Sequence, residues 1–444
     1  MSTSASLIID MRNALVGLVR GQFFRNVAMV LSGAALAQLI TVLFSPVISR
    51  LFTPADFGVL GSFMALVAFA GPIATMSFSS AIVLPRQEED ATALAWLCLL
   101  ISAGTSILSL VAIALFRLTE GRYFAGMLDN LLFLLPLAIF FEGLFQVAQQ
   151  WMLREKLYRL SAQINVAQAA ISTGIKVAAG IFFPTGSSLV LTSLLATPIN
   201  AVSLAFSLNY LSAPVRWPKR IRSSSIQAAA RKFADFPLYR MPQSLFNVSA
   251  QGIPLLVVVS YYGVTIAGFF TLTNTVLNAP TWLLSKTVSD VFFPRLVDAT
   301  HRREPITPLI IKATGALAAV SSVPLGTLMF AGPQIFALFF GLKWFEAGQY
   351  AQWLSLLTLI TLTMRPLLSA LPMLKLQGTY LIFEIVSSVI KLLSVWLAAK
   401  AAVEPTSAIA IFALTGSIVQ LPFCGFVLLK ARRYDSKTRE QASD

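Results

Sequence analysis

The sequence predicts an all-α integral membrane protein of about twelve transmembrane helices, arranged as two six-helix lobes around a central cavity. It is 57% hydrophobic and 12% charged, with a mean hydropathy of +0.77. A soluble domain of 444 residues with this composition would expose a large apolar surface. Apolar stretches long enough to cross a bilayer recur along the chain, at 27–49, 58–80, 92–116, 131–152, 161–183, 187–210, 242–262, 264–290, 308–330, 349–370, 378–399 and 406–429.

The positive charges alternate between the two ends of these spans. Of the 33 Lys and Arg, 23 fall in the N-terminus, the even-numbered loops and the C-terminal tail, and 5 fall in the odd-numbered loops. The positive-inside rule therefore predicts a multi-pass membrane protein with both termini in the cytoplasm. Because the basic residues sit in short loops beside lipid headgroups, the net charge of +14 is attributed to membrane contact, and no nucleic-acid partner is expected.

The predicted domain order has five parts. Residues 1–26 form a cytoplasmic interfacial segment, 27–211 the N-terminal lobe, 212–240 a basic cytoplasmic linker, 241–429 the C-terminal lobe and 430–444 a cytoplasmic tail. Six spans in each lobe make the repeat parallel. Two Gly-bearing outer turns of similar character, Leu51–Gly58 and Tyr261–Phe269, occupy corresponding places in the two lobes.

The residue types needed for metal binding or nucleophilic catalysis are sparse. Cys98 and Cys424 lie in distant apolar spans, and the single histidine, His301, lies in a basic loop. No metal site, catalytic residue or cofactor is therefore expected.

Polar residues inside the spans recur at spacings of three and four, which place each set on one helix face. One alternative is hydrogen bonding between packed helices. The presence of such sets in several spans favours a hydrated lumen, because polar groups avoid lipid. The lumen candidates are Glu142, Gln146, Gln168, Asn247, Gln251, Asn274, Asn278 and Glu384.

Charged residues within the spans make this predicted lumen mildly cationic. Glu142 and Lys176 lie at similar depths and are expected to form an ion pair. The other cationic candidates are Arg25, Arg50, Arg365 and Lys391, and Lys286 and Asp290 rank lower because they lie near a span end. Guanidinium and ammonium groups neutralise phosphate, so the substrate is expected to carry phosphate.

Several local motifs resemble those of the Wzx-type lipid-linked oligosaccharide (O-antigen) flippases, in the polysaccharide transporter family of the multidrug/oligosaccharidyl-lipid/polysaccharide (MOP) exporter superfamily. The similar stretches are Ser49–Gly58, Ala81–Pro85 followed by Glu88, Glu89 and Asp90, Phe236–Tyr239, Val291–Arg295, and Phe340–Gly341 with Trp344. The resemblance implies a MOP-type fold with twelve to fourteen helices.

The resemblance also implies a function. A protein of this kind turns an undecaprenyl-pyrophosphate-linked oligosaccharide repeat unit from the cytoplasmic to the periplasmic leaflet for O-antigen, capsule or exopolysaccharide. It implies a cationic lumen, for which Arg50, Lys176, Arg365 and Lys391 are the candidates. The implied partners are a polysaccharide polymerase, a chain-length regulator and membrane lipids. A proton or sodium ion is left open as the coupling ion, and Glu142 is the best-placed titratable carboxylate.

Two other classes of protein stay open. A cation-coupled multidrug exporter of the same superfamily would favour acidic residues in the first or seventh span, and neither span contains one. A membrane-embedded polysaccharide polymerase or ligase would favour a large outer loop with clustered catalytic groups. The longest predicted outer loop, 117–130, offers only Arg117, Glu120, Arg122 and Asp129.

The predicted topology can be tested by cysteine labelling in a background without Cys98 and Cys424. Ser224→Cys and Ser436→Cys are expected to be protected from a membrane-impermeant thiol reagent in intact cells, because they are cytoplasmic. Gly121→Cys and Gly341→Cys are expected to react. Labelling of the first pair without the second would show that the orientation is opposite to the predicted one.

Overall fold

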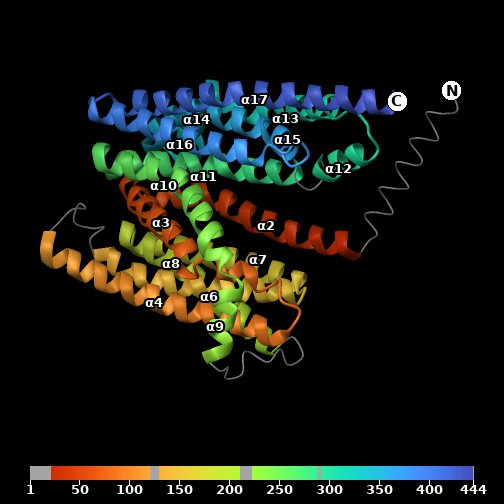
Figure 1. Cartoon of the computed structure of the whole chain (residues 1–444). Helices are drawn as coiled ribbons and strands as arrows, with labels where there is room; N and C mark the ends of the chain where they lie inside the picture. The colour runs from red at the N-terminus through yellow and green to blue at the C-terminus, as the bar shows by residue number, and fades with distance from the viewer. Residues whose placement is uncertain (1–21, 121–129, 211–222, 289–291, 444) are drawn as a thin grey trace. The chain divides into compact units, whose positions relative to one another are not determined.

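The computed structural model describes residues 22–120, 130–210, 223–288 and 292–443, and the regular secondary structure in these ranges is helical (Figure 1). The all-α prediction is confirmed. In chain order the helices are α2 (Gln22–Leu51), α3 (Pro54–Ala74), η1 (Phe78–Ala81), α4 (Glu88–Glu120), η2 (Leu132–Leu134), α6 (Leu135–Arg154), α7 (Tyr158–Phe182), α8 (Gly186–Tyr210), α9 (Ser223–Lys232), η3 (Phe236–Arg240), α10 (Met241–Tyr262), α11 (Val264–Thr287), α12 (Phe293–His301), α13 (Ile306–Phe340), η5 (Leu342–Trp344), α14 (Phe345–Thr363), α15 (Arg365–Ser369), α16 (Gln377–Lys400) and α17 (Pro405–Ser443).

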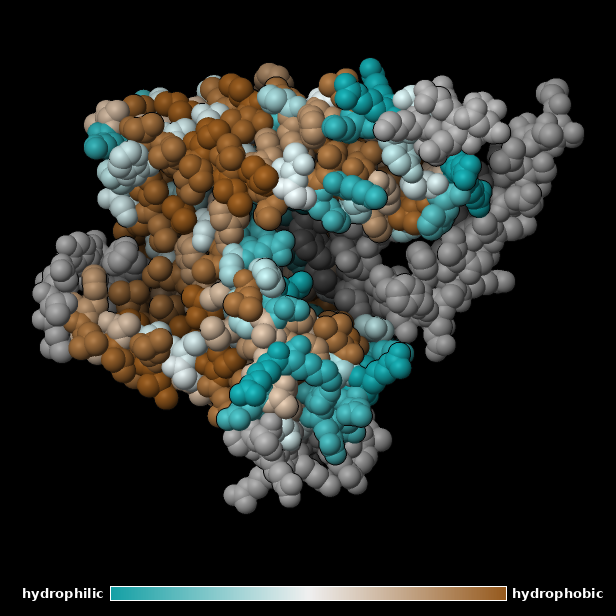
Figure 2. Space-filling view, viewed as in Figure 1, coloured by the Kyte–Doolittle hydropathy of each residue, from teal (hydrophilic) through white to brown (hydrophobic). Residues whose placement is uncertain are grey.

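Within the described ranges, nine helices are long and apolar enough to cross a membrane. They comprise α3, α4, α6, α7, α8, α10, α13, α16 and α17, and their surfaces carry the broad apolar areas seen in Figure 2. A multi-pass membrane protein is therefore confirmed. Helices α2, α11 and α14 lie where the other three spans were expected, and the total of twelve stays a prediction.

The chain divides into two compact units. Unit 1 contains Met1–Phe44, Leu66–Phe183 and Ser188–Val248, and unit 2 contains Ser45–Ala65, Pro184–Ser187 and Ser249–Asp444. The unit boundaries fall inside α2, α3, α8 and α10. The lobe limits predicted from the sequence stay a prediction.

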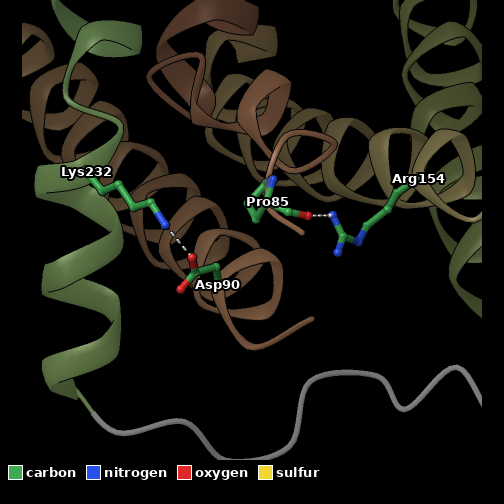
Figure 3. Close-up of polar contacts among 4 residues, drawn as sticks. All are labelled: Pro85, Asp90, Arg154 and Lys232. Carbon is green, nitrogen blue, oxygen red and sulfur yellow. Dashed lines mark hydrogen bonds and ion pairs between the residues drawn. The ribbon is translucent and has the colours of Figure 1, made fainter. Parts of the chain in front are cut away.

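In unit 1, one apolar core joins η1, α4, α6, α8 and α9. Ile82, Leu94 and Trp151 are among its most buried side chains. The short α9 is attached to α4 by an ion pair of 2.6 Å between Lys232 Nζ and Asp90 Oδ2 (Figure 3).

The link between η1 and α4 is held by an arginine from the end of α6. The Arg154 guanidinium donates to the carbonyl oxygens of Ile82, at 3.1 Å, and Pro85, at 2.6 Å (Figure 3). The arginine thereby gives hydrogen-bond partners to two carbonyl groups that have none within a helix.

In unit 2, α3 and α11 approach each other backbone to backbone. A Cβ added to Gly58 would lie 1.8 Å from the Val264 carbonyl oxygen, and one added to Gly268 would lie 1.7 Å from that of Pro54. Any side chain at either position would separate the helices. The two similar outer turns noted in the sequence therefore pack directly against each other.

The turn between α2 and α3 is held by the link that precedes α14. Trp344 is fully buried, and its Nε1 donates to the Ser49 carbonyl oxygen at 2.9 Å. Lys343 Nζ donates to the carbonyl oxygens of Arg50, at 3.1 Å, and Phe52, at 2.7 Å. Burial lowers the pKa of Lys343. Two of the sequence motifs that carry the family resemblance, Ser49–Gly58 and Phe340–Gly341 with Trp344, therefore pack against each other.

The glycine crossing is expected to be essential for folding. Gly268→Ala places a methyl group on the Pro54 carbonyl and should destabilise the protein by about 1–3 kcal/mol or more, as overpacking does. Thermal unfolding and the monodisperse fraction in detergent measure the effect. Gly326→Ala is the matched control, because a Cβ there meets no atom within 4 Å. Equal behaviour of the two variants would contradict the close crossing.

Candidate functional site

The polar residues of unit 1 gather at a break between α3 and η1. Helix α3 contains Pro72 and ends at Ala74, and η1 begins at Phe78. Between them, Met76 and Ser77 have positive φ angles of 47° and 59°, which non-glycine residues rarely adopt. Backbone groups at such a break need partners from elsewhere in the protein.

Gln146 of α6 supplies a partner to one such backbone group, the Gly71 carbonyl, and to two hydroxyl groups beside the break. Its Oε1 accepts hydrogen bonds from Thr75 Oγ1 at 2.9 Å and Ser79 Oγ at 3.1 Å. Its Nε2 donates to the Gly71 carbonyl oxygen at 3.0 Å and to Glu142 Oε1 at 3.1 Å. One amide therefore connects both sides of the break and orients the Glu142 carboxylate.

The expected ion pair between Glu142 and Lys176 is wrong. Both side chains are described, and the ion pairs between described residues are Lys232–Asp90 and Arg295–Glu304. The carboxylate of Glu142 bonds to Gln146 and lies toward Gly71 of α3. Similar depth in the membrane is not enough for pairing, because this face of α6 is directed at α3. Lys176 is partly buried on α7.

In unit 2, three of the predicted charged residues fall near one another. Arg365 begins α15, and Glu384 lies on α16. Tyr380 lies one turn before Glu384 on α16 and packs against the apolar core that contains Met364 and Leu367, on either side of Arg365. Glu384 and Lys391 lie seven residues apart on α16 and form no ion pair among the described residues.

This cluster extends toward α14 and α17. A Cβ added to Gly416 of α17 would lie 3.0 Å from Cδ of Lys391, so the lysine stem lies against that helix. One turn further, Thr361 of α14 and Gln420 of α17 exchange hydrogen bonds of 3.1 and 3.2 Å. We call this set the C-terminal polar track; its members are Arg365, Tyr380, Glu384, Lys391, Thr361 and Gln420.

Sequence reasoning found the three charged members of the track and missed the others. Tyr380 is four residues before Glu384, a spacing that could have identified it. No sequence signal connects Thr361 with Gln420. In the described structure Arg365 is partly buried, and its buried Nε has no hydrogen-bond partner.

The other predicted site residues lie on several different helices. Arg50 is exposed and donates to the Leu338 carbonyl oxygen at 3.1 Å, near the end of α13. Gln168 and Asn274 are partly buried, and Asn247, Gln251 and Asn278 are exposed. The side chains of Arg25 and Lys286, and all of Asp290, lie outside the described part. A common cavity lined by these residues stays a prediction.

A family model described as "Polysaccharide biosynthesis protein" matches residues 47–349. The chain belongs to this family. A curated relative, the succinoglycan biosynthesis transport protein ExoT of Rhizobium meliloti (strain 1021), is 25% identical over 386 residues, which cover 84% of this chain and 71% of the relative. The predicted membership of a polysaccharide biosynthesis family is confirmed, and the curated relative is named as a transport protein.

Solved structures with the same fold are MOP superfamily transporters. An inward-facing multidrug resistance transporter of the MATE family aligns with a TM-score of 0.66 at 14% identity, over 91% of this chain and 99% of its own. A MOP superfamily transporter from Pyrococcus furiosus, whose binding pocket has reverse polarity, aligns with a TM-score of 0.56 at 14% identity, over 96% and 98% of the two chains. At these identities the likeness establishes the MOP-type fold of this polysaccharide biosynthesis family member.

The Gln146 contacts are expected to stabilise the break in α3. Gln146→Ala leaves the Gly71 carbonyl without this partner and the Thr75 and Ser79 hydroxyls bonded only to each other, so it should lower stability by about 1–3 kcal/mol. Thermal unfolding of the purified protein gives the measurement. Gln163→Ala serves as the control, since Gln163 is exposed on the neighbouring α7. A Tm equal to that of the control would remove the structural role assigned to Gln146.

Proposed function

We propose that this protein is a flippase for an undecaprenyl-pyrophosphate-linked oligosaccharide repeat unit, moving it from the cytoplasmic to the periplasmic leaflet. Membership of a polysaccharide biosynthesis family and the fold of MOP transporters support a transport role. The observation that carries the choice of substrate is the C-terminal polar track. It holds a guanidinium and an ammonium group, both partly buried, in a unit made of membrane-spanning helices.

Partly buried cations of this kind suit a diphosphate. Removing a cation from water is costly unless an anion compensates it. Arg365 and Lys391 outnumber the single carboxylate, Glu384, so the track has a net positive charge in which phosphate is favourable. Sugar hydroxyls would bond to amide and hydroxyl groups such as those of Gln420 and Thr361, while the polyprenyl chain stays in lipid.

Transport of this kind needs no covalent chemistry, so we propose that the protein is not an enzyme. Alternating access would carry the headgroup across, with Glu142 as the proposed coupling carboxylate for a proton or a sodium ion. The proposed setting is the bacterial inner membrane with cytoplasmic termini, beside a polysaccharide polymerase and a chain-length regulator.

A cation-coupled multidrug exporter is the second candidate, because the MATE-family neighbours share the fold. Helices α2 and α10, however, contain no acidic residue. A deletion strain distinguishes the two: a flippase is required for surface polymer, whereas a drug exporter is required for resistance to cationic drugs. Unchanged polymer together with drug sensitivity would favour the exporter.

Neutralising the cations of the track is expected to reduce polymer output. Arg365→Gln or Lys391→Gln removes a charge-assisted bond to phosphate, worth about 1.5–3 kcal/mol, so transport should fall by about tenfold or more. Surface polysaccharide and membrane protein are quantified side by side in the complemented deletion strain.

Lys400→Gln is the control for this experiment, since Lys400 is exposed at the end of the same helix, α16. Arg365→Lys tests geometry separately from charge, because lysine lacks the planar fork that grips phosphate through two bonds. Normal polymer from both neutral variants at normal expression would refute a phosphate-binding role for the track.

A further inference from the structure

A surface hollow of about 770 Å³ lies between the first turns of α13 and the last described turns of α17, both in unit 2. Its lining includes two cations, Lys312 and Arg432, which are exposed. Figure 2 shows hydrophilic residues over α12 and along α17 before its C-terminal end. None of the polar residues predicted to line the lumen belongs to this hollow.

The acidic residue in the lining of the hollow, Asp435, already has hydrogen-bond partners. The two carboxylate oxygens of Asp435 accept the backbone N–H groups of Ile306, at 2.8 Å, and Thr307, at 2.9 Å. Asp435 therefore caps the start of α13 from a distance of 129 residues along the chain. Lys312 and Arg432 form no ion pair with any described residue, so the hollow keeps a net positive charge.

The lining of the hollow also contains a buried hydroxyl group, that of Thr307. Thr307 is only 6% exposed, and its Oγ1 makes no hydrogen bond to any described residue. A buried hydroxyl without a partner is unfavourable, and an acceptor oxygen on a bound molecule would satisfy it. Phosphate offers such oxygens and also matches the two cations.

The edge of the hollow is apolar. Ile311 is 47% exposed, and Pro308 is also exposed one turn before it. Because α13 is long and apolar enough to span the membrane, we expect its first turns to lie at the level of the lipid headgroups. A ligand that fits both the cations and this edge has a phosphate head and an apolar tail.

We propose that this hollow binds the phosphate headgroup of an anionic membrane phospholipid, such as phosphatidylglycerol or cardiolipin. Lys312 and Arg432 bind the phosphate, Thr307 donates to one of its oxygens after its side chain rotates toward the hollow, and the acyl chains run along Ile311. The predicted topology puts the site in the cytoplasmic leaflet. The proposal is independent of the substrate that the protein transports.

Native mass spectrometry of the full-length protein, titrated with defined lipids, tests the site. Phosphatidylglycerol and cardiolipin are expected to bind more tightly than phosphatidylethanolamine. The double variant Lys312→Gln/Arg432→Gln should weaken their binding about 100-fold, since each charge-assisted hydrogen bond to phosphate contributes about tenfold. A Lys312→Arg/Arg432→Lys variant keeps both charges and should retain binding, which separates loss of the site from loss of the fold.

Arg433→Gln is the matched control, because Arg433 is the exposed neighbour of Arg432 and does not line the hollow. An equal loss in this control would show diffuse surface charge and overturn the site. Polyprenyl pyrophosphate or inorganic phosphate that binds there with phosphatidylglycerol unable to compete would overturn the phospholipid assignment. Weakening confined to the double variant and to anionic phospholipids is the supporting result.

Discussion

Hydrogen bonds from distant side chains to the ends and breaks of helices hold this structure together. Backbone groups that a helix leaves unpaired need hydrogen-bond partners where packing shields them from water, and the protein supplies these partners. Trp344 and Lys343 do this where α2 ends, Arg154 does it in the link before α4, and Asp435 does it where α13 begins. Gln146 does it at the break after α3. Each contact joins segments that are far apart in sequence, and each lies within one compact unit.

This constraint changes how the polar residues of the spans are interpreted. A polar residue in an apolar span either has a hydrogen-bond partner within the protein or takes part in binding a ligand. Arg50 has the Leu338 carbonyl, and Gln146 has the break in α3, so structure accounts for both. The described structure gives no comparable backbone partner to Arg365 Nε. The functional hypothesis therefore rests more on the C-terminal polar track than on the end of α2.

Sequence patterns predicted the parts that depend on local periodicity. Apolar runs located the helices, and the four-residue spacing placed Glu142 and Gln146 on one face, where they hydrogen-bond. Pairing between helices was beyond these patterns, because spacing along one helix does not say which neighbour its face meets. The Glu142–Lys176 pair failed for that reason. The contact of Gln146 with Thr75, 71 residues away, needed the packed structure.

The track also connects stability with transport. A partly buried cation without a close counter-ion costs free energy in the empty protein, and that cost persists only where something else benefits from it. A phosphate bound between Arg365 and Lys391 would compensate both charges, so the loaded protein would be more stable than the empty one by an amount set by ligand concentration over Kd. Release on the other side of the membrane would restore the unfavourable state. The same two charges of unit 2 would then favour both the binding of the phosphate and the next cycle of binding after its release. The hydrogen bonds that cap the helix ends lie elsewhere, so the scaffold of unit 2 would stay unchanged.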